Sequence, residues 1–354
     1  MSPTLTDADE HIALQTRVGS ALEEFVRHET QLLTAIHTDL QPVARQLEIV
    51  VAGGKRLRAA FCYWGWRAAG QPDSDALVKA AAAMELVHAA AVVHDDLIDD
   101  SALRHGKPSA HVALRAAISE RSCARAGGRA LALLCGDLLM SWAGQLFTSC
   151  GLPTAYLSRA HALWSVLARE LIAGECLEVL RTGGEPDATG SLQVIRYKTA
   201  KYTVEHPLHI GGALAGAPRR LMQTFSAYAL PLGEAFQLRD DLLGVFGDSR
   251  RTGKSTSDDI VGNRPTALLA ETWAAATTAE RSELRGLLGR PGLAESGLLR
   301  VREIMRRTGA PVRVEDMITQ RGRAAESALT LANLPRDATR ALTHLATLAL
   351  AREH

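Results

Sequence analysis

The stretch from Leu77 to Val93 constrains the fold more than any other part of the sequence. Almost every position in it is apolar, and it is too long for a single strand. Glu85 and His88 interrupt it too often for a membrane-spanning helix. We therefore expect a helix that is buried on most of its sides, and such a helix needs other helices packed around it.

A second apolar stretch, Phe225 to Leu238, has the same character. Alanine, leucine and arginine dominate the chain while aromatic residues make up only 5%, so the composition favours helices over strands. Glycine and proline turn signals recur every few tens of residues, and no change in composition marks a linker. We predict an all-α protein in which residues 1–354 form a single domain, with its motifs within residues 50–270.

Charge and targeting patterns exclude several classes of protein. The net charge is +1, which gives no reason to expect nucleic acid or an anionic membrane as a partner. The N-terminus lacks a secretory pattern, and no run reaches the ~20 uninterrupted apolar residues of a membrane span. The five cysteines are scattered and odd in number, which favours buried free thiols. We expect a cytoplasmic protein.

Aspartates follow the first apolar stretch directly, in the run Asp95-Asp96-Leu97-Ile98-Asp99-Asp100. Asp95 and Asp99 are four residues apart and share one helix face, where like charges repel. Divalent cations are the natural compensation, and a ligand set made only of oxygen atoms favours Mg²⁺. Mg²⁺ usually completes its shell with phosphate oxygens, so the run predicts a phosphorylated substrate. Alone, such a run is also common at a solvated helix end.

A second acidic pair, Asp240-Asp241, follows the other apolar stretch, and Asp248 comes shortly after. We expect both acidic sets at the C-terminal ends of their helices, where the helix dipole makes negative charge unfavourable. Two such sets can hold one diphosphate through several metal ions, provided that cationic side chains bind the remaining charge. The basic segments that fit this role are Gly53–Arg58, Arg104–Lys107, Lys198–Thr203 and Gly253-Lys254 with Arg264.

Five motifs in order carry a family resemblance: GGKRLR, DDLIDD followed by LRHGKP, KTAKYT, FQLRDDLLGVFGD, and GKSTSDD. Together they resemble the trans-type polyprenyl (isoprenyl diphosphate) synthase family, most closely its bacterial geranylgeranyl diphosphate synthases. The resemblance spans residues 50–270, whereas the flanking regions merely fit as further helices. It implies a single bundle of mostly antiparallel helices around a deep central cavity, usually as a homodimer.

The resemblance also implies a role for each motif. Asp95, Asp99 and Asp240 bind Mg²⁺, with about three ions in each active site, and Asp96, Asp100 and Asp241 take supporting places. Arg104, Lys198 and Lys254 bind the allylic diphosphate. Lys55, Arg58 and His88 bind isopentenyl diphosphate, and Thr199 and Gln237 line the reacting carbons. Taken alone, His88 on an apolar face is more typical of an ordinary core histidine.

The implied reaction lengthens dimethylallyl, geranyl or farnesyl diphosphate with isopentenyl diphosphate and releases pyrophosphate. Some positions depart from the family pattern. His105 stands where a second arginine is common, which bears on the binding of isopentenyl diphosphate. Glu175 and Glu178 replace the usual glutamine and aspartate, Gly244 replaces an aspartate, and Arg264 keeps the charge of a usual lysine.

Product length depends on the residues just before the first aspartate run. In the family, large aromatics four and five residues before it stop chain growth, but here those residues are Ala91 and Ala90. We therefore expect a product longer than farnesyl diphosphate, namely geranylgeranyl diphosphate. The limit then lies deeper, at residues such as Met84 and Val87 or at Trp142, although Met84 and Trp142, each taken alone, are more typical of ordinary core packing.

Two other functions remain open at this point. A class I terpene cyclase shares the helical bundle, but its second metal motif is absent around Asp240 and it has no second diphosphate to hold. A non-catalytic partner subunit of a heteromeric synthase is expected to lose metal ligands, whereas every central aspartate is present here.

Overall fold

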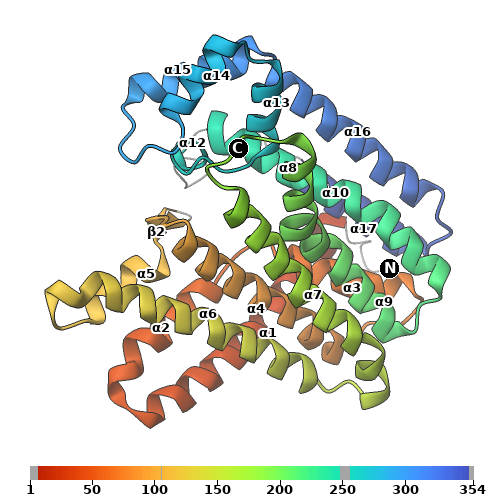
Figure 1. Ribbon diagram of the computed structural model, residues 1–354. Coiled ribbons are helices and arrows are strands. Elements are labelled where there is room, and N and C mark those ends of the chain that lie inside the picture. Colours follow the sequence, from red (N-terminus) through yellow and green to blue (C-terminus); the bar gives the residue numbers. More distant parts are fainter. Residues whose placement is uncertain (1–6, 105, 248–255, 351–354) are drawn as a thin grey trace. The chain divides into compact units, whose positions relative to one another are not determined.

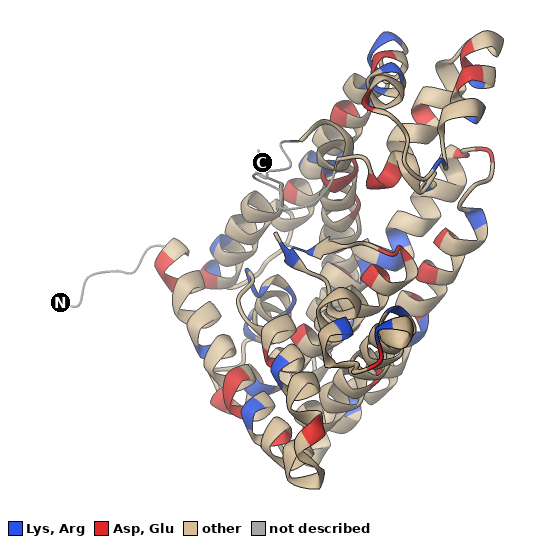
Figure 2. Ribbon diagram, turned by 90° about the vertical axis from the view of Figure 1, so that its left-hand side faces the viewer, with Lys and Arg blue, Asp and Glu red and all other residues tan. Residues whose placement is uncertain are grey.

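The computed structural model describes residues 7–104, 106–247 and 256–350, and these are almost entirely helical (Figure 1). The predicted all-α fold class is confirmed. Basic and acidic residues are interspersed along the helices, as expected for a chain with a net charge of +1 (Figure 2). The chain divides into two compact units, so the single domain remains a prediction.

The first unit comprises Met1–His161, Pro207–Ala217 and Pro335–His344. Its helices are α1 (Asp7–Ile36), α2 (Gln41–Val51), α3 (Leu57–Ala68), α4 (Asp75–Ile98), α5 (Ala110–Ala113), α6 (Ala124–Thr148), most of α9 (His206–Ala215) and the start of α17 (Arg336–Leu350), with the short 3-10 turns η1 (Thr38–Leu40), η2 (Leu114–Ala117) and η3 (Arg121–Cys123).

Helix α4 is the centre of this unit, and it confirms the buried helix predicted from Leu77–Val93. Ser74 begins it by accepting a hydrogen bond from the Leu77 N–H, as an N-cap serine should. The alanines at 80–83 are fully buried, and these small side chains let α1, α3 and α6 approach the helix closely. Glu85 is also buried, and it accepts a hydrogen bond from Ala59 N in the first turn of α3 at 2.9 Å.

A short hairpin follows α4 and was not predicted. Strands β1 (Leu103–Arg104) and β2 (Lys107–Pro108) pair antiparallel, with Arg104 opposite Lys107. Gly106 between them has a φ of 72°, a conformation that glycine adopts without strain. The two-residue strands are too short to produce an alternating pattern in the sequence.

The second unit comprises Ala162–His206, Pro218–Leu334 and Leu345–His354. It contains most of α7 (Thr154–Arg181), then α8 (Ala188–Val194), the π-helix η4 (Ile195–Glu205), α10 (Arg219–Phe246), α12 (Asp258–Val261), α13 (Ala267–Ala275), α14 (Thr278–Leu287), α15 (Glu295–Arg307) and α16 (Ala310–Thr330). Its core lies between α10, α13, α15 and α16.

The π-helix η4 carries the KTAKYT motif between α7 and α10. A side chain at Gly174 of α7 would place its Cβ 2.2 Å from the backbone of Lys198, and one at Gly233 of α10 would come within 2.5 Å of Ala200. Glycine on both neighbours therefore makes room for the wider helix. Long π-helices are rare, and π-helical turns often occur at functional sites.

Helix α10 corrects one expectation about the second acidic pair. We expected Asp240 and Asp241 at the end of their helix, but α10 continues to Phe246. Leu242 and Val245 are buried and extend its apolar face, which holds the last turns against the core. The aspartates therefore lie inside the helix, away from its C-terminal carbonyl groups.

Two helices, α4 and a segment from Arg121 to Thr148 that includes α6, are long and apolar enough to cross a membrane by length and composition alone. For α4, 72% of the apolar window is buried inside the protein, which is typical of a core helix. Cys62, Cys135 and Cys150 are buried, as expected, whereas Cys123 and Cys176 are exposed, and all five thiols are free.

Candidate active site

The first aspartate run lies where it was predicted, at the C-terminal end of α4. Asp95 and Asp96 are in the last turns of the helix, and Asp99 is its C-cap, donating its N–H to Asp95 O at 2.9 Å. Asp95 and Asp99 thus lie one turn apart, and both are partly exposed, whereas Asp96 is only 3% exposed.

Arginine side chains compensate the negative charge at this helix end. Arg104 Nε donates to Asp96 Oδ1 at 2.9 Å, and its Nη2 donates to Asp95 Oδ2 at 2.9 Å. Its Nη2 also forms an ion pair with Asp96. Because Asp96 is buried, this guanidinium compensates a charge that would otherwise be costly. Asp100, the last aspartate of the run, forms ion pairs with Arg125 and Arg129 of α6.

The residues predicted to bind isopentenyl diphosphate lie near the start of α3 and on α4. Lys55 is exposed, Arg58 is 9% exposed in the first turn of α3, and His88 is half-buried on α4. Gln15 of α1 holds the preceding loop by donating to Gly54 O at 2.7 Å. All belong to the first unit, together with Arg104.

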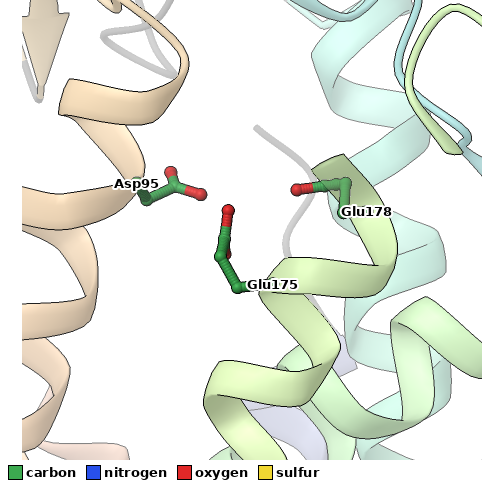
Figure 3. A group of neighbouring side chains, drawn as sticks. All are labelled: Asp95, Glu175 and Glu178. Atoms are coloured by element: carbon green, nitrogen blue, oxygen red, sulfur yellow. The ribbon is translucent and has the colours of Figure 1, made fainter. Parts of the chain in front are cut away.

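In the second unit, Lys198 of η4 is held by two glutamates of α7. Its Nζ lies 3.0 Å from Glu175 Oε2, and it also forms an ion pair with Glu178. Figure 3 shows Glu175 and Glu178 one turn apart on α7, and it also draws Asp95, which comes from α4 in the other unit. Glu175 and Glu178 depart from the family pattern, and in this chain they have a definite structural role as the ion-pair partners of Lys198.

Thr199 and Gln237 form a hydrogen-bond relay to the second acidic pair. Thr199 Oγ1 donates to Gln237 Oε1 at 2.8 Å, and Gln237 Nε2 donates to Asp241 Oδ1 at 2.9 Å. Ala267 N donates to the other carboxylate oxygen of Asp241 at 3.3 Å. Burial, reinforced by the nearby charges of Asp259 and Asp240, raises the pKa of Asp241 to about 8.

The remaining predicted residues divide between described and undescribed parts of the chain. Arg264 donates to Asp259 Oδ1 at 3.0 Å, so its guanidinium has an acidic partner. His105 and Lys254 lie outside the described residues, as does Asp248. Val87 and Ala90 are fully buried on α4 and Ala91 is partly exposed.

The donor sets fit Mg²⁺. Asp95 and Asp99 offer carboxylate oxygens one turn apart at a helix end, and Asp240 offers another in the second unit. Hard divalent cations of this size bind a few carboxylates and leave positions for water and phosphate oxygens. No sulfur or imidazole ligand belongs to the predicted set, so the chemistry of the donors agrees with the expected metal.

Some residues that shape the site were not recognised from the sequence. Glu178 and Glu175 appeared only as departures, although their i,i+3 spacing beside a lysine-bearing motif was a usable signal. Glu85 appeared only as an interruption of the apolar stretch, whereas it caps α3. Arg125 and Arg129 of α6, the ion-pair partners of Asp100, were also missed. They are four residues apart, which places both guanidinium groups on one face of that helix.

Comparison with known proteins gives a consistent result. The family model for polyprenyl synthetase matches residues 41–305. Octaprenyl diphosphate synthase of Escherichia coli is 33% identical over 66% of this chain and 67% of that protein. Geranylfarnesyl diphosphate synthase of Aeropyrum pernix is 30% identical over 75% of this chain and 79% of that protein.

A solved structure agrees over nearly the whole chain. It is the geranylgeranyl pyrophosphate synthase from Corynebacterium glutamicum, complexed with isoprenyl diphosphate and magnesium. Its TM-score is 0.90 at 30% identity, covering 96% of this chain and 98% of that one. The matched family region contains both aspartate runs and the KTAKYT motif. The chain described here therefore belongs to the polyprenyl synthetase family and is a trans-prenyl diphosphate synthase.

Proposed function

We propose that this enzyme adds isopentenyl diphosphate to an allylic diphosphate and that its main product is the twenty-carbon geranylgeranyl diphosphate. The observation that carries the reaction is the end of α4, where Asp95 and Asp99 lie one turn apart beside the Asp95–Asp96–Arg104 ion pairs. In the reaction, the carbon–oxygen bond of the allylic diphosphate breaks and pyrophosphate keeps the electron pair. The double bond of isopentenyl diphosphate attacks the allylic cation, and loss of a proton restores a double bond.

The protein residues take separate roles in this proposal. Asp95, Asp99 and Asp240 hold Mg²⁺, which when bound neutralises charge on the departing pyrophosphate. Arg104 and Lys198 bind the allylic diphosphate, as do the undescribed Lys254 and, through its charge, Arg264. Preorganised cations of this kind are the largest source of catalysis where charge develops on a leaving group.

The other substrate and the reacting carbons are assigned to a different set. Lys55, Arg58 and His88 bind isopentenyl diphosphate, with the undescribed His105 nearby in sequence. The Thr199 hydroxyl and the Gln237 amide, fixed by their 2.8 Å hydrogen bond, offer dipoles that stabilise a carbocation without capturing it. No protein nucleophile takes part.

The chain-length proposal rests on α4. Ala90 and Ala91, one turn before Asp95, have small side chains, and Ala89 beside them is also small. Val87 and Met84, about one and two turns further back, are larger and buried, which supports a limit at that depth. The curated relatives include enzymes named for farnesyl, geranylgeranyl and octaprenyl products, so their names do not choose among lengths.

Product analysis tests the proposal. The purified chain is incubated with Mg²⁺, isopentenyl diphosphate and each of the dimethylallyl, geranyl and farnesyl primers, and the dephosphorylated products are identified by mass. We expect a twenty-carbon alcohol, and we expect Ala91→Phe to shorten it. A fifteen-carbon product overturns the length proposal, whereas no elongation with any primer favours a terpene cyclase or a non-catalytic partner subunit.

We also propose that the enzyme is a cytoplasmic homodimer. Exposed apolar side chains support the dimer: Leu133 and Leu134 on α6 in the first unit, and Val179 and Leu180 on α7 in the second. Exposed apolar pairs of this kind on long helices suit a surface that another chain covers. Sedimentation analysis of the wild type and of Leu134→Glu tests this, because a dimer should dissociate when a charge enters its interface.

A further inference from the structure

The last turn of α4 ends on a residue in an unfavourable conformation. Asp100 has a φ of 52°, and Ser101 N donates to Asp96 O at 3.0 Å. This is the hydrogen bond of a Schellman helix end, with Asp100 at the left-handed position that glycine usually occupies. An aspartate there is disfavoured relative to glycine, so other contacts must hold it.

Two arginines of α6 provide those contacts. Arg125 Nη2 donates to Asp100 Oδ2 at 2.9 Å, and Arg129 Nη1 donates to Asp100 Oδ1 at 2.9 Å. His111 Nε2 is a more distant neighbour of the same carboxylate at 3.5 Å. All of these residues belong to the first unit, so the cluster is built within one compact body.

The two arginines differ in their contact with the backbone of α4 and in their exposure. Arg129 Nη2 also donates to Leu97 O at 3.1 Å, so this guanidinium bridges the Asp100 side chain and a backbone carbonyl of the last helical turn. Within the described residues, the hydrogen bond of the Arg125 guanidinium goes to the carboxylate of Asp100, and the Arg125 side chain is 70% exposed against 39% for Arg129. Leu97 lies between Asp95 and Asp99, the pair proposed to bind Mg²⁺.

We propose that Arg129 is a positioning residue for the metal-binding pair, and this rests on the proposed function. By holding Leu97 O and Asp100 together, it fixes the turn on which Asp95 and Asp99 are carried. Asp100 is then an anchor for this turn and does not bind the metal itself. Residues that orient metal ligands from behind typically change metal affinity or activity by about 10- to 100-fold when they are replaced.

Matched variants separate positioning from charge. Arg129→Gln and Arg125→Gln each remove one positive charge bound to the same carboxylate. Arg129→Lys keeps the charge but cannot bridge two acceptors as a planar guanidinium does. Asp100→Gly removes the anchor while placing glycine at the left-handed position, so it should not lower the stability of the helix end.

The measurements are the binding of Mn²⁺ in the presence of inorganic pyrophosphate, followed by electron paramagnetic resonance, and the Mg²⁺ concentration that gives half-maximal rate. We expect Arg129→Gln, Arg129→Lys and Asp100→Gly each to lower the Mn²⁺ affinity about tenfold. Each should also raise the Mg²⁺ concentration for half-maximal rate about tenfold. Arg125→Gln should change them by less than about twofold, because exposed ion pairs contribute little. The double variant of Arg129→Gln with Asp100→Gly should be no weaker than either single variant.

Thermal unfolding accompanies each variant. If Arg129→Gln fails to fold, Arg129→Lys and Asp100→Gly carry the test. Equal effects of Arg129→Gln and Arg125→Gln, or unchanged Mn²⁺ binding in Asp100→Gly, overturn the proposal. Mn²⁺ binding is measured without turnover, so an inactive wild type refutes the proposed function while the positioning role is still judged by metal affinity.

Discussion

The two aspartate sets are held in opposite ways. At the end of α4, Asp96 is buried beside the guanidinium of Arg104, and Asp100 is paired with arginines of α6. Near the C-terminal end of α10, but inside the helix, Asp241 is equally buried, and its hydrogen-bond donors are the neutral Gln237 amide and the Ala267 N–H. Burial therefore raises the pKa of Asp241 to about 8.

The two sites show that a buried carboxyl group in this protein can have either a charged or a neutral hydrogen-bond donor. A guanidinium partner keeps a buried carboxylate ionised, because the charge is compensated within the protein. Amide donors satisfy the hydrogen-bonding capacity of the oxygen atoms but do not compensate the negative charge. Burial then favours the protonated form of the carboxyl group. Asp96 is thus compensated by a guanidinium of its own chain, whereas Asp241 is held by neutral donors and its burial favours the protonated carboxyl group.

The largest expected effect on stability is at the compensated site. Arg104→Met leaves the buried Asp96 without its guanidinium partner, and such a loss costs about 3–5 kcal/mol of unfolding free energy. Equilibrium unfolding in urea measures it, with Arg104→Lys as the control that retains charge. A loss below about 1 kcal/mol contradicts the account of this site.

A smaller loss is expected at the amide-held site. Gln237→Leu removes one of the two donors to Asp241, and an unsatisfied buried acceptor costs about 1–3 kcal/mol. Thr199→Val, which removes only the hydrogen bond to Gln237, should cost about 1 kcal/mol or less. If Gln237→Leu costs as much as Arg104→Met, the distinction between the two sites is wrong.

The fold class was predicted correctly from the sequence, and the residues of the candidate site were chosen from its motifs. Apolar stretches longer than a strand required helices, and the motif order identified the residues of both aspartate sets. The end of α10 was misplaced because Leu242 and Val245 continue an apolar face through the polar motif. The π-helix was missed because its lengthened turn depends on Gly174 and Gly233 in neighbouring helices, far away in sequence. The partners of Asp100 depend on the packing of α6 against α4.

Glu170 of α7 is a further carboxylate whose pKa depends on its partners, which are Lys201 of η4 and His206 of α9. Burial by itself raises its pKa, but hydrogen bonds from Lys201 and His206 outweigh burial and hold the pKa below its ordinary value. Its contribution to stability is therefore present above the unfolded pKa near 4.5 and is lost as pH falls through the lower folded value.

Glu170→Gln should flatten the decline in unfolding free energy between about pH 5 and 3, by about 1 kcal/mol or less, since the group is partly exposed. Chemical denaturation at several pH values measures the two curves. Parallel curves for wild type and variant would show that Lys201 and His206 do not hold this carboxylate as the structure indicates.

We propose that the aspartates of both sets support prenyl transfer. The most direct test of this role is single-turnover formation of pyrophosphate and elongated product by the wild type, Asp95→Ala and Asp240→Ala, with Asp316→Ala on the exposed side of α16 as control. We predict that both site variants slow the reaction by about 10³-fold or more, in the range expected for lost electrostatic stabilisation, while the control matches the wild type. Wild-type rates in Asp95→Ala would contradict the account.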